Sequence, residues 1–229
     1  MAHPFALRKP AAAATIDGVV VRCSLLSVLL LAAGKAPPAM NSVEPERVLM
    51  VVSSATEIRL ADGTAMPVGY WASEVEVPLT RLRAAGYVVD VVTPGGRTPS
   101  PDPVSLPKDP EKATAARASL SKLAGILTPG SLEALDSAAV DRYAAVVIPG
   151  GYAPMVDLAA SSALRDVLMR MMMHGKVVAA ICHGPAAFLS TKRPPAPWPF
   201  AGYRMAAFTN AEEEAWLKER KLSWRVMGK

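Results

Sequence analysis

Cys182 lies where a cysteine side chain can act as a nucleophile. The apolar segment 176–181 predicts a buried strand that leads into it, and Gly184 and Pro185 follow at the first turn of a predicted helix. A sharp strand-to-helix turn lifts the sulfur out of the sheet and places it beside the positive end of the helix dipole, which lowers the pKa of a thiol. The alternative is an inert buried cysteine. The junction favours a reactive thiolate.

A parallel sheet would position such a turn, and the rest of the sequence predicts one. Apolar runs alternate with helix-like stretches, which is typical of a doubly wound α/β fold with helices on both faces of a mostly parallel sheet. One helix is expected from Ser73 to about Ala85, and another shows an apolar stripe at helical spacing from Leu164. The predicted strands are 48–52, 88–92, 144–148 and 176–181.

Unusual residues gather at the carboxyl ends of the predicted strands. In a sheet of this kind, ligands and reacting groups lie along that edge. We therefore expect the site to be built from the segments that lie at or just beyond it. These segments are Gly69–Glu74, Pro149–Tyr152 and Cys182–Gly184.

Composition excludes several classes of protein. Of the 229 residues, 51% are hydrophobic and 20% are charged, so the chain is not disordered throughout. Its two cysteines lie far apart and form neither a disulfide framework nor a Cys-x-x-Cys site, and the few histidines predict no metal site. The net charge of +5 comes mostly from the residues after Ala215. We interpret them as a solvated end and expect no nucleic-acid partner.

Residues 1–46 differ from the rest and are interpreted as a leader. Arg22 precedes the apolar run 23–33, and small residues and prolines continue to Ala39, which outlines a secretory signal. The run is too short for a transmembrane helix, so no stable membrane span is expected. The preferred interpretation is a disordered leader or translation from Met40, which predicts a cytoplasmic protein. Export through a signal peptide is the alternative.

Four segments together resemble the ThiJ/PfpI superfamily, a group of class I glutamine amidotransferase-like proteins. They occur between about Val48 and Ala215, and they are most similar to the branch of heat-shock chaperones and glyoxalase III. The resemblance implies a flavodoxin-like, amidotransferase-like domain over 47–229. The segments are PVGYWASEVEVP at 67–78, VVIPGGYAPMVDL at 146–158, AICHGPAAFLS at 180–190 and FTNAEEEA at 208–215.

The resemblance implies a nucleophile and a carboxyl group beside it. Cys182 would be the nucleophile, and Glu74 would lie against its sulfur and move a proton. A carboxyl group packed beside the sheet would be partly desolvated, which raises its pKa. The sequence pattern alone does not choose Glu74 over Glu76, and it leaves a solvated helix residue as the alternative.

His183 would be the acid–base partner of the cysteine, oriented by a carboxylate. The matching position is Glu213, although a shift of one residue would substitute Glu212 or Glu214. The amides of two paired glycines, with that of His183, would form an oxyanion hole, and a simple tight turn is the alternative. Tyr152 stands where this branch has a histidine, so substrate binding or proton transfer there would differ. The paired glycines are Gly150 and Gly151.

Two departures limit the resemblance. No His-x-Glu pair of the glutamine amidotransferases follows Ala215, which argues against glutamine hydrolysis. The segment Trp216–Lys229 is short and basic, unlike the further segment of the family, so we expect a truncated C-terminal part that leaves a sheet edge exposed. Because exposed edges favour dimerisation or aggregation, a homodimer is one partner that this edge would allow.

The resemblance implies a cofactor-independent enzyme with a nucleophilic cysteine. It would convert a small aldehyde, a 2-oxoaldehyde such as methylglyoxal, to a hydroxy acid, as a glyoxalase III-like lyase of the D-lactate dehydratase type or a deglycase. A stress-response holdase that binds unfolded protein clients is the first alternative, and the run Met169–Met173 would supply an adaptable surface for it unless the run is core. A PfpI-like cysteine peptidase and a redox sensor at Cys182 are further alternatives. The sequence leaves the substrate open.

Overall fold

The computed structural model describes residues 44–60 and 63–219. The signal-like stretch Arg22–Ala39 and the rest of the predicted leader before residue 44 lie outside the described residues, as do residues 220–229 of the basic end. The predicted division of the chain therefore stays a prediction. None of the helices within the two described ranges is long and apolar enough to cross a membrane.

A five-stranded parallel sheet forms the centre of the fold, which confirms the predicted fold class. The strand order is β5-β4-β1-β6-β7, so the first strand is central and later strands are added on both sides of it. The four predicted strands all occur, each within two residues of its expected bounds. The strands are β1 (Arg47–Val51), β4 (Val88–Thr93), β5 (Gly130–Ser131), β6 (Tyr143–Ile148) and β7 (Val177–Ala180).

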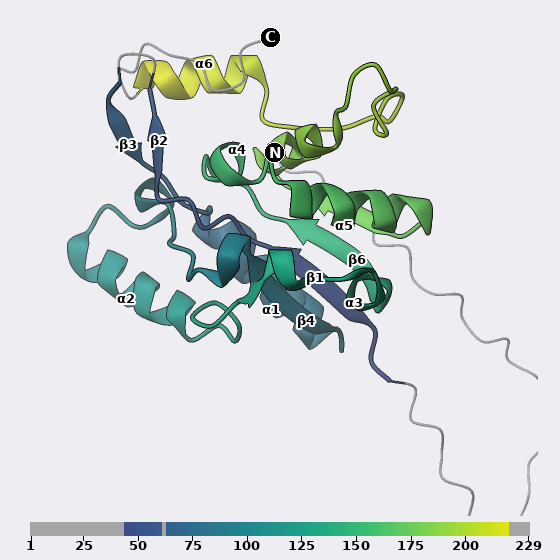
Figure 1. Ribbon diagram of the computed structural model, residues 1–229. Helices are drawn as coiled ribbons and strands as arrows, with labels where there is room; N and C mark the ends of the chain where they lie inside the picture. Colours follow the sequence, from purple (N-terminus) through teal and green to yellow (C-terminus); the bar gives the residue numbers. More distant parts are fainter. Residues whose placement is uncertain (1–43, 61–62, 220–229) are drawn as a thin grey trace, which may run out of the picture. The chain divides into compact units, whose positions relative to one another are not determined.

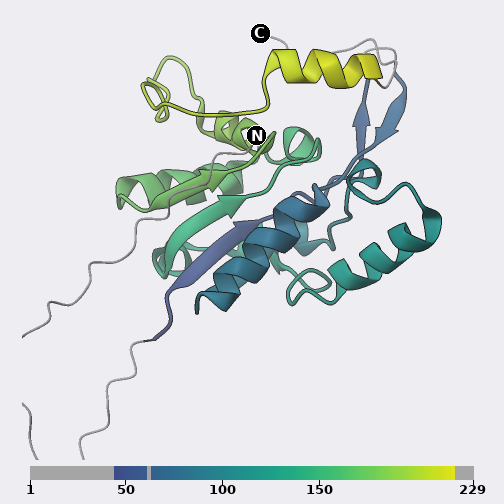
Figure 2. The same cartoon turned by 180° about the vertical axis from the view of Figure 1, so that it is seen from behind.

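The central strand β1 shows how both faces of the sheet are buried. Successive side chains of a strand point to opposite faces, and Leu49 and Met50, both fully buried, belong to two different core clusters. The cluster around Leu49 is completed by α5 (Ser162–Met173), and the cluster around Met50 by α1 (Ala72–Ala84). Figure 1 shows α5 on the near face of the sheet, and Figure 2 shows α1 on the opposite face.

The helix α5 forms where the apolar stripe predicts it. Leu164, Leu168 and Met171 on this stripe are fully buried, and the Ser161 hydroxyl caps the helix by accepting from the Leu164 amide at 3.1 Å. The methionine run is divided, because Met171 lies in the core whereas Met173 is 71% exposed. Of the run considered as an adaptable surface for a holdase, Met171 is therefore core, Met172 packs against the core and Met173 faces solvent.

The remaining elements connect the strands or cover the carboxyl end of the sheet. The antiparallel pair β2 and β3 packs against α6 through Ile58, Met66 and Trp216, and both figures show the pair beside that helix. The remaining helices and strands are β2 (Glu57–Arg59), β3 (Ala65–Pro67), α2 (Pro110–Ser121), α3 (Ser137–Asp141), α4 (Pro154–Asp157) and α6 (Asn210–Glu219), with 3-10 helices at Pro94–Gly96, Pro103–Ser105, Leu132–Ala134 and Gly184–Thr191.

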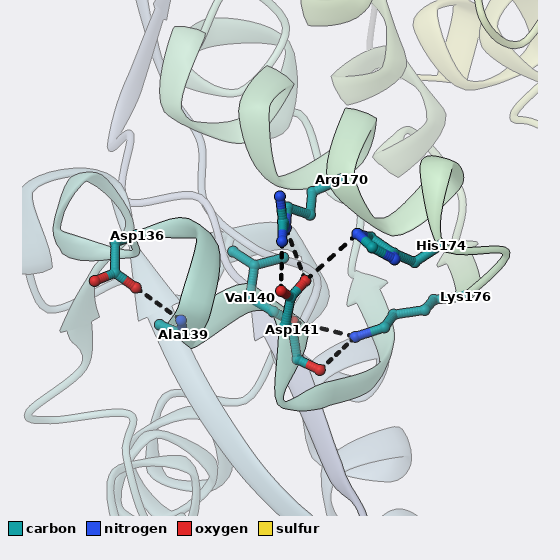
Figure 3. Close-up of polar contacts among 7 residues, drawn as sticks. All are labelled: Asp136, Ala139, Val140, Asp141, Arg170, His174 and Lys176. Carbon is teal, nitrogen blue, oxygen red and sulfur yellow. Dashed lines mark hydrogen bonds and ion pairs between the residues drawn. The ribbon is translucent and has the colours of Figure 1, made fainter.

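The amino ends of β6 and β7 carry an exposed cluster of charges (Figure 3). Asp141, just before β6, receives a hydrogen bond from Arg170 Nε at 2.7 Å, and His174 Nε2 lies 3.7 Å from the same carboxyl group. Lys176, just before β7, donates to the Asp141 carbonyl oxygen at 2.6 Å. Arg170 holds the pKa of the Asp141 carboxyl below its ordinary value. The cluster joins α3 to α5 at the solvent surface.

Candidate active site

A sharp turn just after β7 presents the side chain of Cys182. Its φ of 56° is positive, a strained conformation that no other described residue except glycine adopts. A 3-10 helix, Gly184–Thr191, follows in place of the α-helix expected from Pro185. Most of its side chains are buried, so packing rather than a helical stripe sets its tight winding. A Cβ at Gly184 would lie 2.5 Å from the Ile148 carbonyl oxygen, so the turn requires glycine there.

The sulfur of Cys182 lies in a half-buried, polar setting. It shares a hydrogen bond with the Glu74 carboxyl group, and the amides of Gly151 and His183 point at it. Burial raises the pKa of the thiol to about 12, and the charge of Glu74 adds to the rise. The expected lowering of the thiol pKa is therefore wrong for the resting site, because burial and a facing carboxylate outweigh two amide dipoles.

Glu74 comes from the first turn of α1 and is half-buried, whereas Glu76 is exposed. Its Oε2 accepts a hydrogen bond from the Gly150 amide at 2.8 Å. Burial raises the pKa of the carboxyl group, although the bonds from Gly150 and Cys182 oppose the rise. The Gly150 amide is thus engaged by Glu74, and of the three amides expected in an oxyanion hole, those of Gly151 and His183 face the sulfur.

A chain of buried hydrogen bonds leads from the sulfur into the protein. His183 Nδ1 lies 3.2 Å from Cys182 Sγ, and His183 Nε2 lies 3.1 Å from Glu213 Oε2. The Tyr152 hydroxyl donates to the other carboxylate oxygen of Glu213 at 2.9 Å. Burial lowers the pKa of His183, although Glu213 opposes the shift, and the burial favours the neutral imidazole. The hydroxyl of Tyr152 is therefore directed at Glu213, and the ring of Tyr152 lines the site.

The start of α6 explains why Glu213 rather than a neighbour meets the histidine. Thr209 and Glu212 form a capping box, because the Thr209 hydroxyl accepts from the Glu212 amide at 3.2 Å and Glu212 Oε2 accepts from the Thr209 amide at 2.8 Å. This fixes Glu212 at the helix end, and Glu214 is exposed. Glu213, 1% exposed, is the one that points inward.

The paired glycines let the loop after β6 lie against the turn at Cys182, which we call the elbow. Gly151 has a φ of +88°, and a Cβ there would lie 2.8 Å from the Trp71 amide nitrogen and still closer to the Gly69 carbonyl oxygen. A Cβ at Gly150 would lie 2.6 Å from the Ile181 carbonyl oxygen. The simple-turn alternative does not account for these contacts, since both glycines are required by close backbone approach to the site.

These residues open into a pocket of about 350 Å³. The sequence interpretation missed three aromatic residues that line it. Trp71 and Phe208 lie inside the quoted segments, so their position was a signal, whereas Trp216 belongs to the stretch interpreted as a basic end. Within the described residues no three His, Cys, Asp or Glu side chains converge as metal ligands would. The pocket is lined by Trp71, Glu74, Gly151, Tyr152, Cys182, His183, Phe208 and Trp216.

Comparison with known proteins gives relatives of similar sequence. The chain is 27% identical over 171 residues to the protein/nucleic acid deglycase HchA of Pseudomonas aeruginosa, covering 72% of this chain. It is 27% identical over 179 residues to that of Staphylococcus aureus, covering 73%. In both cases the match spans 58% of the relative's own length.

Solved structures of similar fold extend the comparison. The crystal structure of glyoxalase III from Candida albicans matches with a TM-score of 0.58 at 20% identity, covering 78% of this chain and 76% of that one. The Rapid Encystment Protein 24 KDa of Francisella tularensis matches with a TM-score of 0.62 at 22% identity, covering 76% and 75%. A family model described as the DJ-1/PfpI family matches residues 65–194, which include the elbow, the paired glycines and the carboxyl group beside the sulfur. The chain therefore belongs to the DJ-1/PfpI family.

Proposed function

We propose that this protein is a cofactor-independent enzyme that uses Cys182 to convert 2-oxoaldehydes to 2-hydroxy acids, and to release such aldehydes from their adducts with amines. The observation that carries the proposal is a sulfur in contact with Glu74 and His183 at the wall of an open pocket. The relatives named protein/nucleic acid deglycase support an activity of this kind.

The first step is addition of sulfur to the aldehyde carbon. The thiol proton of Cys182 passes to the Glu74 carboxylate as the carbon–sulfur bond forms. Glu74 then gives that proton to the aldehyde oxygen, which yields a hemithioacetal and restores the carboxylate. Because the proton moves between two buried neighbours, the pair carries one negative charge before and after the transfer. The amides of Gly151 and His183 point at the sulfur, and in this proposal they also stabilise charge on the oxygen of the carbon bonded to it.

The second step moves a proton between the two carbons. Glu74 as a carboxylate takes the proton from the carbon bonded to sulfur and returns one to the neighbouring carbon, while the hydroxyl proton passes to the second oxygen. The hemithioacetal becomes a thioester of a 2-hydroxy acid. Water then adds to the thioester carbon, the carbon–sulfur bond breaks, and the thiol is restored. One water is consumed, and no oxidant or reductant is needed.

The buried relay orients the histidine for the hydrolytic step. Glu213 faces Nε2 of His183, which favours the tautomer with an unprotonated Nδ1 directed at the sulfur side of the pocket. A neutral imidazole in that orientation takes a proton from the attacking water. Tyr152 holds Glu213 in place through its hydroxyl, so its proposed role is positioning rather than substrate activation.

The first test is the Cys182→Ala variant with methylglyoxal in the absence of glutathione. We expect the wild-type chain to form lactate and the variant to lose at least about a thousandfold in turnover, since the nucleophile is removed. Lactate is measured after a fixed time by chromatography. Activity that survives the substitution would contradict the proposal.

The holdase is the alternative from a different class of function. Suppression of client aggregation that is equal in wild type and Cys182→Ala, together with no lactate from either, would favour it. The peptidase alternative predicts cleavage of a peptide substrate that is lost in the same variant.

A further inference from the structure

Four rings form a continuous row along the catalytic pocket. Trp216 packs on Tyr152 with ring centres 4.9 Å apart, Tyr152 on His183 at 4.6 Å, and His183 on Phe208 at 4.5 Å. The two inner rings belong to the buried relay, and their positions are fixed by Glu213. The two outer rings are partly exposed, and both line the pocket. Trp71 adds a fifth ring to the same pocket from the start of α1.

The described lining of the pocket disfavours substrates that carry a phosphate or carboxylate group. Among the described residues that line it there is no lysine or arginine, and the one carboxyl group besides the relay is Glu74. A phosphate or carboxylate on the substrate would therefore find no cation to replace its hydration. The surface that remains for recognition is aromatic, and it favours flat, uncharged groups that stack.

The size of the pocket also favours a substrate larger than methylglyoxal. A volume of about 350 Å³ falls within the range of sites that hold drug-sized molecules, whereas methylglyoxal is a three-carbon compound. A second pocket of about 290 Å³ shares Tyr152 and Trp216 with the first, and apolar Met66, Pro67 and Val104 help to line it. The site thus has room for a substituent beyond the reacting carbons.

We propose that the site prefers a 2-oxoaldehyde that carries a planar aromatic group, and that Trp71 and Trp216 recognise this group by stacking. The inference rests on the proposed function for the identity of the reacting aldehyde. Recognition itself depends on the rings alone. The two tryptophans are specificity residues and take no part in proton transfer.

The first test compares substituents of similar size that differ in planarity. Turnover of phenylglyoxal, cyclohexylglyoxal and methylglyoxal is measured as kcat/KM in wild type, Trp216→Leu and Trp71→Leu. We expect the phenyl-to-cyclohexyl ratio to fall about fivefold in at least one tryptophan variant. Because the ratio is compared between variants, the intrinsic reactivity of each aldehyde cancels. Tyr203→Leu, which removes an exposed ring outside both pockets, should leave the ratio unchanged.

A second test requires no turnover. The rate at which Cys182 is alkylated by N-phenyliodoacetamide and by N-cyclohexyliodoacetamide is followed by peptide mass spectrometry in the same four proteins. We expect faster reaction of the planar reagent in wild type and the same fall in the ratio in the tryptophan variants. Equal rates for the two reagents, or ratios that the tryptophan substitutions leave unchanged, would overturn the inference. A planar preference in alkylation without turnover of any aldehyde would refute the proposed function and support the inference about recognition.

Discussion

The surroundings at the two ends of strands β6 and β7 shift the pKa of a carboxyl group in opposite directions. At the amino ends Asp141 is 40% exposed, and Arg170 lowers the pKa of its carboxyl group. At the carboxyl ends Glu74 is half-buried and forms no ion pair with any residue that the structure describes, and burial raises the pKa of its carboxyl group. The amino-end cluster keeps a charge where water and an arginine favour it. The carboxyl-end site holds an acid in surroundings that disfavour its charge, which is the condition for moving protons near neutral pH.

The backbone differs between the two ends as well. The carboxyl end contains the strained turn at Cys182 and glycines pressed against neighbouring backbone. At the amino end Gly175 also has a positive φ, 62°, but a Cβ there would meet nothing within 4 Å. The glycines at the site are therefore pressed against neighbouring backbone, whereas Gly175 is not, and three substitutions test the contrast between the two ends.

The largest effect is expected from Gly151→Ala. The added methyl group would meet the Gly69 carbonyl oxygen and the Trp71 amide in addition to the strain of a positive φ, so the free energy of unfolding should fall by more than about 3 kcal/mol. Gly175→Ala is the matched control and should cost about 1 kcal/mol, because it carries the strain alone. Urea unfolding measures both. Equal losses would show that the two ends are packed alike.

An intermediate effect is expected from Glu74→Gln. Turnover should fall about a hundredfold or more, since the amide cannot accept the thiol proton, while the Gly150 amide keeps an oxygen acceptor. The pKa of Glu74 is raised in the folded state, so burial of the ionised carboxyl group destabilises the fold. This destabilisation is zero below the unfolded pKa and increases as pH rises through the folded pKa. The variant should therefore be more stable than wild type at neutral pH and equal to it in acid. Glu76→Gln, on the exposed side of the same helix, should change neither quantity, and a fall in stability of Glu74→Gln at neutral pH would contradict the assignment.

The smallest effect is expected from Asp141→Asn, which should lower stability at neutral pH where Glu74→Gln raises it. The folded pKa of Asp141 is lowered, so its ion pair stabilises the fold above the unfolded pKa and is lost as pH falls through the folded pKa. The variant should melt at a slightly lower temperature at neutral pH, and the difference should shrink in acid and in high salt. Turnover should stay within about twofold of wild type, because the cluster lies at the far end of the strands. A large loss of turnover would mean that the two ends are coupled.

Some of these features follow from sequence pattern, and others depend on packing. The continuous apolar run around Leu49 predicts a strand buried on both faces, and the spacing from Leu164 predicts α5, because burial alone sets those patterns. The place of Cys182 at a strand end likewise follows from the apolar segment before it and from Gly184 and Pro185 after it. The family resemblance supplied Glu74 and Glu213, which periodicity does not separate from their neighbours.

Three properties of the site could not be obtained that way. The rise in the pKa of the Cys182 thiol depends on desolvation by residues distant in sequence. The engagement of the Gly150 amide by Glu74 joins segments 76 positions apart. The place of Trp216 in the pocket wall depends on how α6 packs against the antiparallel pair β2 and β3, and no local sequence pattern specifies that packing.

One short helix carries two unlike parts of the site. Glu213, which orients the histidine, and Trp216, which walls the pocket, stand three positions apart on α6 and so share one side of it. A displacement of α6 would therefore take the carboxylate from His183 and the indole from the pocket wall together. Any substitution that loosens this helix should consequently alter the orientation of the histidine and the shape of the pocket at once.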